Sequence, residues 1–249
     1  MVSGVIVVLV CALIAHQIWT DRTQYPKFEA ATASEERQKW LRKWLIDSFI
    51  RYGVIGLVCL YVLEPGWSVL RLPPDMALSR DLLFGGGPFS VDNLSGWAFG
   101  FAIFLILLMA ALSVIPFLTK PPELPEGGTM AMLPRNWREA GYTSGLSVNA
   151  GVSEEIVFRL VLVIAILDLT GSLLIAITVA SALFAIAHAY QGVGGVIASG
   201  IAGLVLMGIY LLTGQLWLIV IIHILSDLRA LLFLPWGMGW FRTRPGASH

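Results

Sequence analysis

The segment SEEIVFRLVLVIAI, residues 153–166, joins a membrane-like sequence to three charged side chains. Its second half is apolar, whereas its first half carries Glu154, Glu155 and Arg159. Charged groups inside a membrane are costly unless they are paired or hydrated, and they mark functional positions by default. The segment therefore predicts a membrane-spanning helix that carries a polar site.

The composition of the whole chain supports a membrane protein. Of its 249 residues, 57% are hydrophobic and 13% are charged, against roughly a quarter charged in soluble domains. Sixteen Lys and Arg balance sixteen Asp and Glu, so the net charge indicates no nucleic-acid or acidic partner, whereas the apolar composition indicates the lipid bilayer as a partner. Cys11 and Cys59 lie in apolar stretches without metal-ligand spacing, and we expect them to be small buried hydrophobic residues.

The apolar runs predict an all-α, polytopic transmembrane helix bundle with about seven spans, each about 20 residues long. The predicted spans cover residues 2–19, 45–63, 97–118, 146–169, 171–190, 193–212 and 216–234. The first run has no positively charged residues before it and exceeds a signal-peptide core in length, so we expect it to be retained; cleavage or re-entrant placement is the alternative. The expected organisation is an N-terminal layer of three spans (1–125), a catalytic helix bundle (126–235) and a cytoplasmic tail (236–249).

Basic residues set the expected orientation, because Lys and Arg favour the cytoplasmic side of a membrane protein. They concentrate in two of the long loops and in the tail. These residues are Arg22, Lys27, Arg37, Lys39, Arg42, Lys43, Lys120, Arg135, Arg138, Arg242 and Arg244. We therefore expect a multi-pass integral protein with these segments in the cytoplasm. The tight later loops favour a prokaryotic plasma (inner) membrane.

Two pairs of ionisable residues on the predicted spans are spaced four apart, and a fifth ionisable residue, Glu154, has no partner at this spacing. Glu155 and Arg159 are four positions apart with the acid first, which favours a structural ion pair. Glu154 points about 100° away around the helix, and we expect this unpaired glutamate to take a proton from water. His223 and Asp227 are also four apart, so the carboxylate could hold an imidazole NH and fix the tautomer.

One further histidine, His188, shares a helix face with Phe184 on the fifth predicted span. The depths of these residues place Glu154, His188, His223 and Asp227 together in the cytoplasmic half of the bundle. A transporter or channel that uses the same groups as a proton or cation relay is the alternative, and broken helices would favour it. Near these charges the sequence offers only Gly151 and no proline, which counts against a broken helix.

Three ordered motifs carry a resemblance to a known family. EEIVFR (154–159) is similar to EExxxR, FAIAH (184–188) to FxxxH, and HILSD (223–227) to Hxxx(N/D). Together they resemble the CPBP (or Abi) family of CaaX-processing and bacteriocin-processing intramembrane proteases, over about residues 130–235. The resemblance implies an intramembrane endopeptidase that acts on a membrane-associated protein or peptide. Phe184 would be the packing residue of its motif.

By this resemblance, Glu154 and His188 would activate a water, and His223 with its i+4 partner would support the oxyanion. Two versions stay open: zinc bound by Glu154, His188 and His223, or glutamate and histidine acting without metal. The chain lacks the HExxH spacing of many zinc proteases.

One position departs from the family pattern, because Asp227 stands where many members carry Asn. An ionised carboxylate would repel an oxyanion. We therefore hypothesise that Asp227 orients and charges His223; a protonated Asp227 or a metal ligand are the alternatives. A catalytically silent scaffold or immunity protein is a third function, and the presence of all three motifs argues against it.

Overall fold

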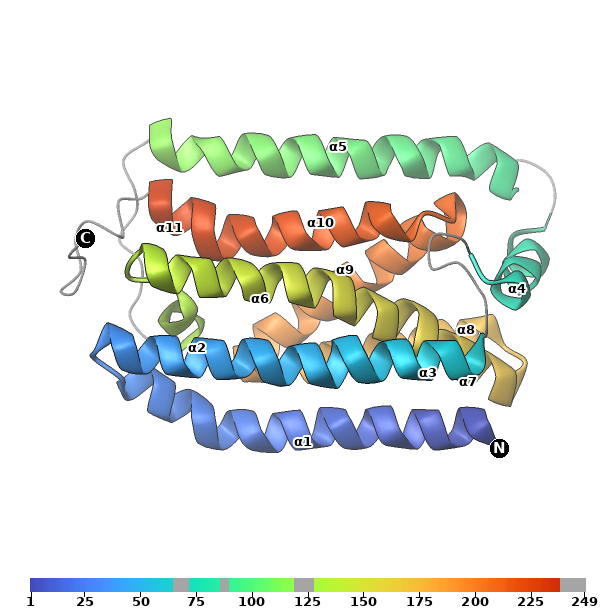
Figure 1. Ribbon diagram of the computed structural model, residues 1–249. Coiled ribbons are helices and arrows are strands. Elements are labelled where there is room, and N and C mark those ends of the chain that lie inside the picture. Colours follow the sequence, from blue (N-terminus) through green and yellow to red (C-terminus); the bar gives the residue numbers. More distant parts are fainter. Residues whose placement is uncertain (65–71, 86–89, 119–127, 238–249) are drawn as a thin grey trace.

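The computed structural model describes residues 1–64, 72–85, 90–118 and 128–237. These residues are helical almost throughout and contain no strand, which confirms the all-α prediction. Figure 1 shows the long helices lying side by side, with the N-terminus at one end of the bundle.

Eleven α-helices form the described part of the chain. In order they are α1 (Val2–Ala30), α2 (Ser34–Ser48), α3 (Ile55–Leu63), α4 (Pro74–Phe84), α5 (Val91–Leu118), α6 (Trp137–Glu155), α7 (Leu162–Thr170), α8 (Leu173–Ala187), α9 (Gly192–Thr213), α10 (Leu216–Leu228) and α11 (Leu234–Gly237). Three π-helical segments, η1 (Phe49–Val54), η3 (Ile156–Val161) and η5 (Arg229–Phe233), join α2 to α3, α6 to α7 and α10 to α11. Two short 3-10 turns, η2 (Gly128–Met132) and η4 (Ala189–Gln191), precede α6 and α9.

Within the described ranges, five helical rods are long and apolar enough to cross a membrane, by length and composition. They cover Val2–Ala30, Ser34–Leu63, Val91–Ile115, Ala189–Thr213 and Leu216–Gly237. The other two predicted spans are also helical but differ in kind. One is the shorter apolar helix α8, and the other is the α6–η3–α7 rod, whose middle carries the charges of the EExxxR motif. The chain is an integral membrane protein.

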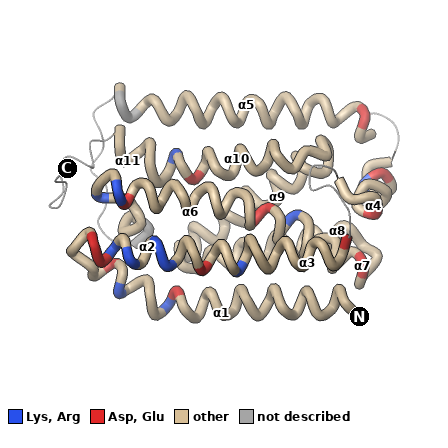
Figure 2. Tube along the Cα trace, in the orientation of Figure 1, with Lys and Arg blue, Asp and Glu red and all other residues tan. Residues whose placement is uncertain are grey.

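The region expected to be a long polar loop, residues 64–96, contains a helix that the apolar runs did not predict. Helix α4 begins with Pro74 at its first position, where the fixed φ of proline suits a helix start. Figure 2 shows that Lys and Arg gather near the α1–α2 turn and the beginning of α6, at the end of the bundle opposite the N-terminus. Lys120, Arg242 and Arg244 lie outside the described residues.

The N-terminal helices share one hydrophobic core with the later ones. Helix α1 packs along α7 and α8, and α3 packs along η3. Buried Ile6, Val10 and Ile14 of α1 belong to the same cluster as Leu160 and Val161 of η3. The expected boundary between an N-terminal layer and a catalytic bundle therefore crosses a continuous core, and the division itself stays a prediction.

A buried ion pair ties α2 to the start of α6. Arg37 was expected to be a basic loop residue, but its side chain and that of Glu139 are fully buried, with Nε 3.0 Å from Oε2. Arg37 Nη2 donates to the carbonyls of Ala131 (2.9 Å) and Leu133 (3.2 Å). The hydroxyl of Ser34 donates to the other oxygen of Glu139 at 2.6 Å. This contact fixes where α6, and hence the site residues on it, begins.

Replacing Arg37 by Leu should lower the free energy of unfolding by about 3–5 kcal/mol, because it leaves the Glu139 carboxylate buried and unpaired. Thermal unfolding of the detergent-solubilised protein measures this loss. The matched control is Lys43→Leu, which removes an exposed i,i+4 pair with Asp47 and should cost at most about 1 kcal/mol. Equal losses in both variants would contradict the structural role of Arg37.

Candidate functional site

The candidate residues lie beside π-helical segments. Glu154 and Glu155 end α6 just before η3, and Asp227 precedes η5 by two residues. A π-helical turn changes the register of the helix that follows it and is frequent at functional sites. Segment η3 follows the two glutamates of α6, and η5 follows Asp227 of α10.

Glu155 is held by a buried guanidinium. Arg159 Nε lies 2.9 Å from Glu155 Oε2, and both side chains are buried. The Nη2 group of Arg159 donates to Oε1 at 3.3 Å, whereas the Nε–H is not aligned for a hydrogen bond. The guanidinium carbon also lies 4.7 Å from the centre of the Phe184 ring, which attracts a cation through its π face.

The carboxylate of Glu155 also contacts His223. The sequence patterns predicted both residues but not this contact between them. His223 Nδ1 lies 2.8 Å from Glu155 Oε1, whereas its Nε2 lies 3.9 Å from Asp227 Oδ2, beyond hydrogen-bond range. The sequence predicts Asp227 as the carboxylate that orients His223, but the oxygen within hydrogen-bond range belongs to Glu155 on the neighbouring α6–η3–α7 rod. Helical spacing alone could not reveal it, because the contact joins residues 68 positions apart.

Glu154 faces His188 across a short gap. Glu154 Oε2 lies 3.9 Å from His188 Nε2, and this buried oxygen has no hydrogen-bond partner among the described residues. His188 Nδ1 lies 2.8 Å from the carbonyl oxygen of Phe184. A carbonyl can only accept, so Nδ1 carries a hydrogen, and in the neutral ring Nε2 would be the nitrogen with the lone pair.

Phe184 fills the space between the two histidines. Its ring centre lies 4.6 Å from that of His188 and 6.1 Å from that of His223. Helix α9 closes on it at Gly203, where an added Cβ would come within 3.1 Å of the Phe184 ring. The ring therefore packs all three motifs of the sequence against one another.

A cavity of about 160 Å³ opens beside these residues. Glu154 and Asp227 line it, but much of its wall comes from the N-terminal helices. These wall residues include Gln17, Asp21 and Gln24 of α1, and Ser48, Arg51 and Tyr52 of the α2–η1 segment. We call this cavity the chamber. Neither histidine is among the described residues that line the chamber, but His188 lies 3.9 Å from Glu154 and His223 lies 3.9 Å from Asp227.

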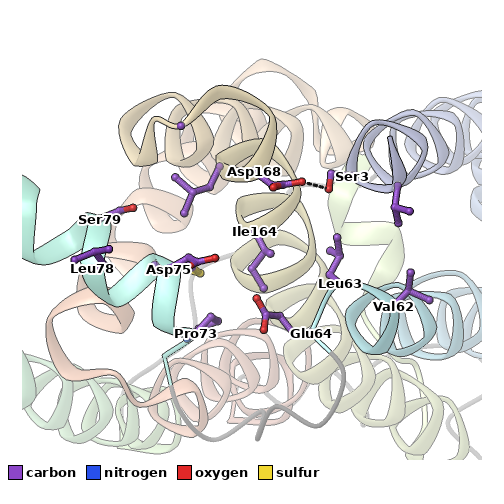
Figure 3. Close-up of a pocket in the computed structure, with 14 residues that line it drawn as sticks. Ser3, Val62, Leu63, Glu64, Pro73, Asp75, Leu78, Ser79, Ile164 and Asp168 are labelled. Carbon is purple, nitrogen blue, oxygen red and sulfur yellow. Dashed lines mark hydrogen bonds between the residues drawn. The ribbon is translucent and has the colours of Figure 1, made fainter.

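A second cavity, of about 510 Å³, lies between the N-terminus of α1, the end of α3, α4 and the end of α7. Figure 3 shows Glu64 and Asp75 turned towards its middle and the Ser3 hydroxyl donating to Asp168. Burial and the charge of Asp75 raise the pKa of Glu64 above its ordinary value. The described residues that line this cavity include no histidine and none of the motif residues. The larger cavity is therefore not the candidate site.

A metal would need at least three ligands gathered on one point. Within the described ranges, no three His, Cys, Asp or Glu side chains are close enough to hold an ion. His223 directs Nδ1 to Glu155 instead of towards Glu154 and His188, so these residues do not form a ready ligand set. Zinc at Glu154, His188 and His223 stays a prediction.

Gly151 permits the close approach of α6 and α10. A Cβ at this position would lie 2.4 Å from Ile224 Cγ1 and 3.1 Å from the backbone nitrogen of Ile224. Backbone cannot move aside as a flexible side chain can, so α10 would have to shift. Ile224 follows His223 directly, and the contact between Glu155 and His223 depends on this spacing.

Gly151→Ala should therefore destabilise the protein by about 1–3 kcal/mol, as overpacking does, despite the better helix propensity of alanine. Thermal unfolding measures the change. Gly141→Ala on the same helix is the matched control, because an added Cβ there meets nothing within 4 Å. It should be neutral or slightly stabilising. A stable Gly151→Ala protein would show that α6 and α10 need not approach so closely.

Part of the chain, including the residues described above, matches a known protein family. Residues 136–229 match the family model described as type II CAAX prenyl endopeptidase, Rce1-like. No curated protein and no solved structure matched the chain. The matched segment begins at Asn136, which caps α6 by accepting from the amides of Arg138 and Glu139, and it contains all three motifs. Residues 136–229 are therefore identified as a segment of the Rce1-like type, which is part of the CPBP family.

Proposed function

We propose that this protein is an intramembrane endopeptidase that hydrolyses a peptide bond in a membrane-associated protein or peptide. The match to a prenyl endopeptidase family supports a protease at the level of the family. The observation that carries the proposal is the pairing of Glu154 Oε2, a buried oxygen without a hydrogen-bond partner among the described residues, with the Nε2 of His188, 3.9 Å away.

The separation of these two atoms suits a bridging water. A distance of 3.9 Å is too long for a direct hydrogen bond, and one water can contact both atoms. Glu154 would act as the general base and take a proton from this water, while the oxygen attacks the peptide carbonyl carbon. The proton then passes to the leaving nitrogen as the carbon–nitrogen bond breaks, which leaves a free acid and a free amine.

His223 would stabilise the oxyanion. Its Nδ1 is engaged by Glu155, and its other nitrogen, Nε2, lies 3.9 Å from Asp227, which lines the chamber. Because Nδ1–H is donated to the Glu155 carboxylate, Nε2 can donate only when the ring is protonated. In that imidazolium, an Nε2–H directed at the developing oxyanion would lower the barrier, because a fixed donor in a poorly hydrated site costs no reorganisation. Arg159 supports this role indirectly by holding Glu155.

The substrate would reach the site from the basic end of the bundle. The chamber lies among α1, the α2–η1 segment, α6 and η5, and Lys and Arg gather around the α1–α2 turn. The bias of Lys and Arg towards the cytoplasm supports cleavage in the cytoplasmic half. A prokaryotic plasma (inner) membrane remains part of this proposal.

Replacing Glu154 by Gln should lower cleavage by about 10²- to 10⁴-fold, the usual contribution of a general base. Comparison of membrane proteomes from cells with wild-type or Glu154→Gln protein should reveal a precursor that accumulates only in the variant. Asp168→Asn is the matched control, because it makes the same chemical change at the other cavity. Altered ion flux without an accumulating precursor would favour the transporter alternative.

Asp227→Asn should keep most of the activity, within about fivefold of wild type, because Asp227 makes no hydrogen bond to His223 at 3.9 Å. An amide at this position could also donate to the oxyanion. Glu155→Gln should instead be severely impaired, since it removes the charge between Arg159 and His223. Cleavage rates of the identified precursor compare the two variants. Inactivity of Asp227→Asn in a folded protein would restore the carboxylate to an essential role.

A further inference from the structure

Two residues outside the matched segment connect the N-terminal helices to His188. The Tyr52 hydroxyl of η1 donates to Gln17 Oε1 of α1. Gln17 Nε2 in turn donates to the carbonyl oxygen of Ala187 at 3.4 Å. Ala187 is the last residue of α8, and His188 follows it directly.

The carbonyl that Gln17 contacts needs a partner from outside its helix. The last four carbonyls of an α-helix have no partner within that helix, and Ala187 is in this position. The chain turns there through η4, where the amide of His188 bonds to Ala185 at 3.1 Å and that of Gln191 bonds to His188 at 3.0 Å. The amide of Gln17 therefore caps α8 from a separate helix, at the residue before the histidine.

Tyr52 also reaches His188 by packing. Only 3% of its surface is exposed, and its ring centre lies 5.9 Å from that of Phe158. The ring of Phe158 packs edge-on against that of Phe184, with 5.2 Å between the ring centres. The ring centre of Phe184 in turn lies 4.6 Å from that of His188. The hydroxyl of Tyr52 thus connects to His188 through hydrogen bonds with Gln17, and its ring connects to His188 through the packed rings of Phe158 and Phe184.

We propose that Gln17 and Tyr52 form a positioning pair that fixes the turn at His188, so that Nε2 faces Glu154. Neither residue would touch the reacting atoms. The pair lies on α1 and η1, so residues 136–229 would not form a complete site by themselves. The effect on catalysis rests on the proposed function, whereas the effect on the turn does not.

The test uses the full-length protein and three variants. Gln17→Leu removes both hydrogen bonds at similar volume, and Tyr52→Phe removes the hydroxyl but keeps the ring against Phe158. Gln24→Leu is the matched control: it makes the same change two turns along α1, where the amide oxygen accepts from Trp44 (2.9 Å) and Lys43 (3.3 Å) of α2.

Hydrogen exchange of the detergent-solubilised protein, followed by mass spectrometry, reads the turn directly. Gln17→Leu should speed exchange of the amides in residues 185–191 by about five- to tenfold, the value of one net hydrogen bond. Gln24→Leu should leave that segment unchanged. Exchange that rises equally across all helices, or does not rise in this segment, would overturn the positioning role.

Kinetics on the precursor identified through Glu154→Gln provide the second measurement. Gln17→Leu should lower kcat by about tenfold with KM within about twofold, because a shifted general-base partner affects the transition state more than substrate binding. The double variant Gln17→Leu/Tyr52→Phe should be no slower than Gln17→Leu, since the two residues act through one contact. Additive losses would overturn the pairing.

The two measurements separate the two proposals. If the wild-type protein cleaves nothing but Gln17→Leu loosens residues 185–191 selectively, the proposed function fails and the positioning pair stands. If the wild-type protein cleaves its precursor and Gln17→Leu changes neither exchange nor kcat, the positioning pair fails and the proposed function stands.

Discussion

The buried contact of Glu155 with Arg159 and His223 is the constraint on which the rest of the site depends. A carboxylate in this interior is tolerable only with excellent pairing, because desolvation costs several kcal/mol per ion. Arg159 supplies the charge from the same rod at 2.9 Å, and His223 supplies a ring nitrogen from α10 at 2.8 Å. The pairing therefore stabilises the α6–η3–α7 rod and at the same time fixes the position and orientation of His223.

This contact also explains why two adjacent glutamates can have different roles. Consecutive residues on a helix point about 100° apart, so Glu155 faces Arg159 and His223 while Glu154 faces His188 and the chamber. Both oxygens of Glu155 lie close to cationic or polar partners. Glu154 keeps a buried oxygen without a hydrogen-bond partner in the described chain. Glu155 thereby meets the structural demand for charge pairing, and Glu154 keeps the free oxygen that the proposed general base requires.

The N-terminal helices are part of the site as well as part of the core. The family match begins at residue 136, yet Gln17, Arg51 and Tyr52 line the chamber beside Glu154. The Arg37–Glu139 pair further fixes the start of α6 against α2. Both halves of the chain supply the wall of the chamber, so a functional boundary at residue 125 would divide the candidate site.

The sequence alone determined the class of protein and most of its local geometry. Composition and apolar run length predict an all-helical membrane bundle, because spanning a bilayer requires long apolar helices. Spacing within one helix is equally local, which is why Glu155 and Arg159 could be paired, and Phe184 and His188 placed on one face, from residue numbers.

Tertiary structure decided the contacts between helices, because these depend on how closely and at what rotation two rods pack. The carboxylate within hydrogen-bond range of His223 is that of Glu155, 68 positions away in the sequence, and not that of Asp227, four positions away. Gly151, which seemed relevant only as a possible helix break, instead allows α6 to touch the backbone of α10. Arg37, expected to be a solvated loop cation, is buried. In each case the sequence specifies the side chain, but only packing brings its partner within reach.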